Sequence, residues 1–146
     1  MTRKVLQGIE VDLISYSAYD GINSGDPLLF WRCLEEIRQH ARTGPLFGPG
    51  AISIGEYGIP ENDAPVGIHE RYDQMLGVML AFDIQFAAQW ELYCNEFEGK
   101  PKIPPPTPVH DPKLMRGLWL VKPDGTLGVG GTLFHELWNR SRVVTK

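Results

Sequence analysis

The chain has 146 residues, and its 42% hydrophobic and 22% charged residues indicate an ordinary globular protein rather than a disordered segment. Its formal net charge of -4 and the scattering of its 14 Lys and Arg residues argue against a nucleic-acid partner, which would require a basic face. The first residues lack the apolar core of a signal peptide, and no apolar run approaches the ~20 residues that cross a bilayer. The sequence therefore predicts a soluble chain with no membrane partner, and it indicates no particular compartment.

A strand followed by a helix is predicted in the first third of the chain. The segment 11–19 is apolar and β-prone, and it ends at Asp20-Gly21, where a loop begins. Asp26 can cap a helix that begins at Pro27, because the missing N–H of proline would have had no partner at the first helical position. Helical spacing then places four apolar residues on one face before Gly44-Pro45 ends the helix: Phe30, Leu34, Ile37 and Ala41.

The same order of elements continues through the middle of the chain. The segment 51–57 predicts a second strand, 67–80 a second helix and 84–93 a third strand. Strands that alternate with helices in this way are typical of βαβ units, whose strands run parallel. We therefore expect an α/β fold in which three parallel strands, flanked by helices, bring their carboxyl ends to one rim.

The last third of the chain has a different character. Six prolines between residues 98 and 112 are too many for a helix or a central strand, so this segment is predicted to be a surface loop. Asp124-Gly125 between two apolar arms predicts a β-hairpin turn. A closing helix is expected over 132–140, and we interpret 1–146 as a single domain. The apolar face of that helix would consist of Leu133, Phe134, Leu137 and Trp138.

Polar and aromatic residues follow each predicted strand, at the position where parallel α/β folds place their reactive side chains. These residues are Tyr16, Tyr19 and Asp20 for the first strand, Glu56 and Tyr57 for the second, and Trp90, Glu91, Asn95 and Glu96 for the third. Glu56 is the most informative, because it comes directly after an apolar run and lies between Gly55 and Gly58, which permit close approach and unusual backbone angles. A reactive carboxylate and a Glu that caps the next turn both fit this pattern. Trp90 likewise fits either a ligand-stacking surface or core packing.

Three of these segments resemble, in order, the sixth, seventh and eighth strands of retaining glycoside hydrolases with a (β/α)8 barrel, the clan of cellulases, mannanases and β-galactosidases. The matching segments are residues 11–19, the motif Ile54-Gly55-Glu56-Tyr57-Gly58 and the motif Gln89-Trp90-Glu91-Leu92. Residues 117–125 are similar to the turn before the last barrel helix. The resemblance covers most of the chain.

The resemblance implies a partial TIM-like barrel that binds or hydrolyses carbohydrate. Glu56 would be the catalytic nucleophile, and substrate-binding residues would be Tyr19, Tyr57, Trp90 and Glu91. Tyr19 would support Glu56 through its hydroxyl, and Trp90 would form the apolar floor under the sugar. No cofactor is implied, and the histidines and cysteines show no metal-ligand spacing, so no metal site is expected.

The sequence also departs from the family pattern. Many relatives carry a His where Ser17 stands. In the family the general acid/base lies on the fourth strand of the barrel, which is not found in this chain, and a full barrel takes ~250 residues. We therefore expect the chain to be the C-terminal part of such an enzyme.

Two other readings stay open: a non-catalytic carbohydrate- or partner-binding domain, and a small α/β protein unrelated to glycosidases. Three strands leave two open edges and an inner face that would expose Ile, Phe and Trp side chains. A homodimer or larger homo-oligomer is therefore expected.

Overall fold

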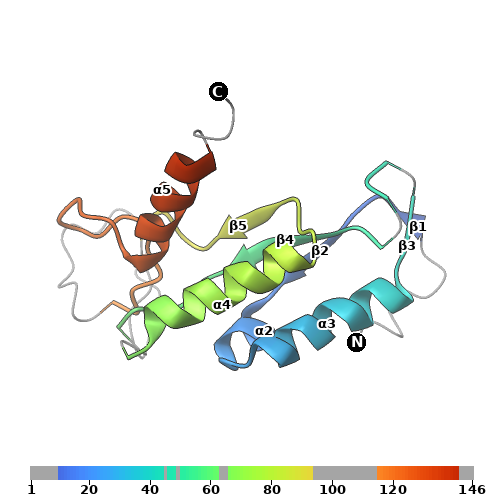
Figure 1. The fold of residues 1–146 in the computed structure, drawn as a ribbon, viewed down its shortest axis with the longest axis horizontal. Coiled ribbons are helices and arrows are strands. Elements are labelled where there is room, and N and C mark those ends of the chain that lie inside the picture. The colour runs from blue at the N-terminus through green and yellow to red at the C-terminus, as the bar shows by residue number, and fades with distance from the viewer. Residues whose placement is uncertain (1–9, 45, 49, 63–65, 94–114, 142–146) are drawn as a thin grey trace. The chain divides into compact units, whose positions relative to one another are not determined.

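The computed structural model describes residues 10–44, 46–48, 50–62, 66–93 and 115–141 (Figure 1). The chain divides into two compact units. The first comprises residues 1–57 and 73–89, and the second comprises residues 58–72 and 90–146. The assignment of 1–146 to a single domain stays a prediction.

The first unit is built on a parallel three-stranded sheet. Its strands are β2 (Ile14–Ser17), β4 (Ile52–Tyr57) and β5 (Ala87–Gln89), and they lie side by side in the order β2-β4-β5. A second parallel pair joins β1 (Glu10–Val11) to β3 (Arg42–Thr43). The prediction of an α/β fold with three parallel strands flanked by helices is thus confirmed (Figure 1).

Two of the predicted strands are longer than the observed ones. The segment 11–19 is not one strand: β2 spans only Ile14–Ser17, and Tyr19 begins the short helix α2 (Tyr19–Asn23). The segment 84–93 contributes only β5, which pairs with β4 through Ala87 and Gln89. In the second unit, the backbones of residues 91 and 92 bond instead to residues 118–121. An apolar run shows that a segment is β-prone, but the strand ends where its hydrogen-bonding partner ends.

Helix α3 (Pro27–His40) forms as its sequence predicts. The Asp26 carboxylate accepts the Leu28 N–H at 2.9 Å, which caps the helix, and Pro27 occupies the first turn. Phe30, Leu34 and Ile37 are buried along one face. The helix ends at His40, just before β3.

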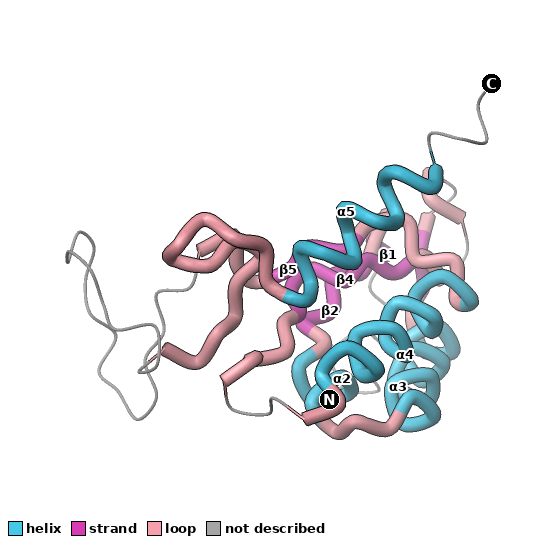
Figure 2. Tube along the Cα trace, turned by 60° about the vertical axis from the view of Figure 1, so that its left-hand side comes forward, coloured by secondary structure: helices cyan, strands magenta, loops and turns pink. Residues whose placement is uncertain are grey.

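Helix α4 (Ile68–Ala81) ends in a Schellman motif. The N–H of Ile84 bonds to the carbonyl of Met79 at 2.9 Å, and the N–H of Asp83 bonds to the carbonyl of Leu80 at 3.1 Å. Asp83 has a φ of 58°, the left-handed conformation that this motif requires at the residue before its last hydrogen-bond donor, Ile84. The motif turns the chain sharply from α4 toward β5. Figures 1 and 2 show α3 and α4 side by side on the same side of the sheet.

The two faces of the sheet differ in chemistry. Ile14, Ile52 and Ile54 are buried, whereas Ser15 and Ser17 are exposed. The expectation that isoleucines line an exposed inner face is therefore wrong, because alternation along the strands turns them toward the helices. Of the Phe and Trp side chains, which were also predicted to be exposed, Phe86 and Trp90 are exposed.

The second unit contains the predicted turn and the closing helix. The Gly125 N–H bonds to the Lys122 carbonyl at 2.9 Å, and Val121 and Leu127 form a single antiparallel bridge, so the hairpin has a turn but no extended strands. Helix α5 spans Val129–Ser141 and begins three residues earlier than predicted. Its Leu133 is buried, but Leu137 and Trp138 are exposed rather than packed.

Two further predictions concern other parts of the chain. The proline-rich segment 98–112 lies outside the described residues, as do Asn95 and Glu96. Within the described residues, no helix combines the length and the apolar character that crossing a bilayer requires.

Candidate functional site

The candidate site lies at the carboxyl end of strands β2 and β4, within the first unit. Glu56 is the second-last residue of β4, and Ser17, the last residue of β2, is its partner in the parallel register. The register shifts between Ile54 and Glu56, because β4 carries one extra residue opposite β2. This irregularity places Glu56 beside Ser17, on the face of the sheet away from Ile54.

The sequence around Glu56 leaves no room for a side chain at the preceding position. A Cβ atom on Gly55 would lie 2.0 Å from the Ser15 hydroxyl oxygen, so a larger residue would force Ser15 to move. In the second unit, a Cβ atom on Gly58 would lie 2.4 Å from the Trp90 carbonyl oxygen. Both glycines thus permit close approach, as predicted, but neither has a positive φ.

Tyr19 and Glu56 are brought together, as the resemblance implies. The Tyr19 hydroxyl donates a hydrogen bond to Glu56 Oε1 at 2.9 Å, and both side chains are half-buried. The backbone holds the same two segments together, because the Ala18 N–H donates to the Glu56 carbonyl at 2.9 Å. Tyr19 is the first residue of α2, so the strand-to-helix turn aims its ring at the carboxylate.

A second phenol–carboxylate pair lies on the same turn. The Tyr16 hydroxyl donates to Asp20 Oδ1, and the same oxygen accepts the Gly21 N–H at 2.9 Å. Burial raises the pKa of the Tyr16 phenol above its ordinary value, and the bond to Asp20 and the nearby Cys33 thiol act in the same direction. The sequence placed both residues after the first strand, but nothing in it indicated that they bond to each other.

The other predicted site residues occupy different positions. Tyr57 is completely buried, and as the next residue after Glu56 it projects from the opposite face of the strand, into the core. Trp90 and Glu91 belong to the second unit, where the Glu91 N–H bonds to the Leu118 carbonyl at 2.8 Å. The peptide bond between them is cis. Trp90 is 37% exposed. Their approach to Glu56 stays a prediction.

Together these contacts define a carboxylate held by a phenol at the end of a parallel strand. Within the described part of the chain, no three His, Cys, Asp or Glu side chains gather in a group that could hold a metal ion. No protein-family model, curated protein or solved structure matches the chain.

Proposed function

We propose that Glu56 is the nucleophile of a retaining glycoside-hydrolase site, and that the three-stranded sheet is an arc of a (β/α)8 barrel. The observation that carries the proposal is the 2.9 Å hydrogen bond from the Tyr19 hydroxyl to Glu56 Oε1, at the carboxyl end of a parallel strand. Reactive groups in such folds gather at that end. A half-buried carboxylate fixed by one hydrogen bond is suited to attack in one direction.

The strand order supports a barrel arc rather than a doubly wound sheet. The order β2-β4-β5 advances without reversing, and α3 and α4 lie on the same side of the sheet (Figure 2). A doubly wound sheet reverses its strand order and carries helices on both faces. A barrel keeps its helices outside and leaves the inner face to side chains such as Ser15, Ser17 and Glu56.

In the proposed chemistry, one carboxylate oxygen of Glu56 accepts a hydrogen bond and the other attacks the sugar. Oε1 accepts the Tyr19 hydrogen bond, which orients the carboxylate, and Oε2 attacks the anomeric carbon of the sugar. The carbon–oxygen bond to the leaving group breaks as the new bond forms, and the leaving oxygen departs with the electron pair. In a natural glycoside that oxygen takes a proton from a second carboxyl group, about 5–5.5 Å from the first. This second role is left unassigned.

An activated substrate tests whether Glu56 acts as a nucleophile, because it reacts without the second carboxyl group that would serve as general acid. A 2,4-dinitrophenolate leaving group is a weak base and needs no proton, and a 2-fluoro substituent on the sugar slows release of the covalent intermediate. We expect a 2-deoxy-2-fluoro glycoside of this type, from a panel of glucosyl, galactosyl and mannosyl forms, to add one sugar to the protein. Mass spectrometry of the digested protein should locate the adduct on Glu56.

Two variants control this experiment. Glu56→Gln should not be labelled, because an amide is a poor nucleophile, whereas Glu70→Gln, on the exposed side of α4, should be labelled like the wild type. Labelling of another residue, or no labelling by any sugar of the panel, would overturn the assignment. Binding of these sugars without labelling would instead favour the non-catalytic carbohydrate-binding reading.

A further inference from the structure

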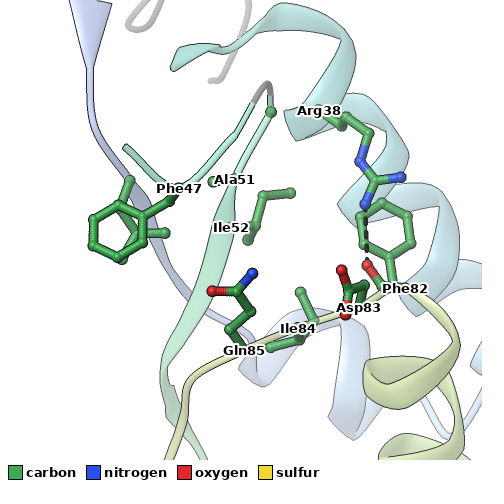
Figure 3. Close-up of a pocket in the computed structure, with 10 residues that line it drawn as sticks. Arg38, Phe47, Ala51, Ile52, Phe82, Asp83, Ile84 and Gln85 are labelled. Carbon is green, nitrogen blue, oxygen red and sulfur yellow. Dashed lines mark hydrogen bonds between the residues drawn. The ribbon is translucent and has the colours of Figure 1, made fainter. Parts of the chain in front are cut away.

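A small pocket lies at the opposite end of β4, away from Glu56 and entirely within the first unit. It is lined by Ala51 and Ile52 at the start of β4 and by residues 82–85, which follow α4. Arg38 on α3 and Phe47 lie on opposite sides of it in Figure 3. The pocket therefore combines a cation, aromatic and aliphatic surface, and the polar residues Asp83 and Gln85.

Arg38 is held in place by three contacts. One guanidinium nitrogen donates to the Phe82 carbonyl at 3.0 Å, and the guanidinium carbon lies 3.7 Å from the centre of the Phe82 ring. The side-chain stem packs against Gly50, where a Cβ atom would lie 2.7 Å from Arg38 Cγ. Phe82 is itself fixed by Trp31, whose ring centre is 4.9 Å away. Within the described part of the chain, the other N–H groups of this fork have no acceptor, so they can donate to a ligand.

Asp83 provides the opposite charge at the same pocket. Among the residues that the structure describes, its carboxylate has no hydrogen-bond or ion-pair partner, and the Gln85 amide has none either. Arg38 and Asp83 do not pair with each other, although both line the pocket (Figure 3). Asp83 also occupies the left-handed position of the Schellman motif, which usually carries glycine. A residue with a Cβ atom in this conformation carries a conformational cost that glycine avoids.

We propose that this pocket binds a free α-amino acid with an aliphatic side chain. The ligand carboxylate would accept two hydrogen bonds from the Arg38 guanidinium, in the bidentate geometry that this group favours. The ligand ammonium would lie against Asp83, and its side chain would contact Phe47, Ile52 and Ile84. A ligand with both charges leaves neither Arg38 nor Asp83 unpaired, whereas a singly charged ligand would leave one of them unpaired. This site is independent of the proposed function of Glu56.

The probe is L-leucine, added to the 15N-labelled full chain and followed by the NMR signals of the Gln85 side-chain amide and the Arg38 Nε–H group. Two leucine analogues each lack one charge: 4-methylpentanoate has no ammonium group and 3-methylbutylamine has no carboxylate. We expect leucine to shift both signals and each analogue to bind roughly tenfold more weakly, since a hydrogen bond to a charged group contributes on this scale.

Two variants locate the site, and each has a matched control. Arg38→Gln and Asp83→Asn should each weaken leucine binding roughly tenfold, whereas the exposed Arg32→Gln on α3 and Asp73→Asn on α4 should not change it. Asp83→Gly keeps the turn, since glycine suits its backbone, and should also weaken binding. The proposal is overturned if leucine causes no shift up to its solubility, or if an analogue binds as tightly as leucine. Binding that the Asp83 variants leave unchanged, or shifts caused by glucose in place of leucine, would also overturn it.

Discussion

Glu61 is expected to stabilise the second unit by capping helix α5 from a distant part of the chain. It is only 8% exposed, and its Oε1 accepts the N–H of Val129, the first residue of α5. Its Oε2 lies 3.3 Å from Lys122 Nζ, on the predicted hairpin turn. Glu61 thus joins three segments: its own loop, the turn and the helix. Replacing it should destabilise this unit without touching Glu56.

The size of the effect follows from these contacts. A hydrogen bond to a charged group contributes about 1.5–3 kcal/mol, and the favourable position of a negative charge at a helix N-terminus is part of the same contact. The ion pair adds less than about 1 kcal/mol, because Lys122 is one-third exposed and solvent screens its charge. We therefore expect Glu61→Ala to lower the free energy of unfolding by about 3 kcal/mol. Glu61→Gln, which keeps an acceptor oxygen, should cost about 1–2 kcal/mol.

Urea unfolding followed by circular dichroism measures these differences. Glu136→Gln is the control, since Glu136 pairs with Arg140 on the exposed surface of the same helix and should change stability by less than about 0.5 kcal/mol. A loss below about 0.5 kcal/mol for Glu61→Ala would refute the capping role. Equal losses for the Gln and Ala variants would show that the charge, rather than the acceptor oxygen, carries the effect.

Three further predictions concern the first unit. The raised pKa of the Tyr16 phenol means that the stabilisation supplied by its neutral form is complete below the unfolded pKa, near 10, and is lost as the pH rises above it. The free energy of unfolding measured in urea should therefore fall more steeply above pH 10 in the wild type than in the Tyr16→Phe variant, and equal slopes would contradict this. Tyr19→Phe should slow the labelling of Glu56 roughly 10- to 150-fold, because one hydrogen bond to the carboxylate is lost; an unchanged rate would remove Tyr19 from the site. Because β2 and β5 form the two edges of the sheet, we propose that the chain self-associates, and a stable 16.4 kDa monomer in light scattering at micromolar concentration would refute this.

The sequence predicted best those elements whose signals are local. The cap at Asp26, the proline at the first helical position and the apolar spacing of α3 all act within one helix, and that helix was predicted to within a few residues. Alternation and β-propensity located β4 and the parallel sheet. The pairing of Tyr19 with Glu56 agrees with the prediction that each lies at the end of a strand, because parallel strands bring their carboxyl ends together.

Contacts between distant segments could not be predicted in the same way. Nothing in the sequence indicates the role of Glu61, because its partners Lys122 and Val129 lie more than 60 positions away. The early start of α5 has the same origin, since Glu61 satisfies the first N–H of the helix. Helical spacing places Arg38 away from the apolar face of α3, and only the fold brings Phe82 against it. Periodicity assigns a residue to a face but cannot name what covers that face.

The two proposed sites lie at opposite ends of one strand, and this separation has a measurable consequence. Ile52 lines the pocket and Glu56 forms the site, and four residue-to-residue steps along the strand separate them by about 13 Å. Changes more than about 7–10 Å apart that share no partner usually act additively. We therefore expect Asp83→Asn to leave the labelling rate of Glu56 unchanged, and Glu56→Gln to leave leucine binding unchanged. A change in either measurement would show that β4 couples its two ends, and the two sites would then have to be treated as one.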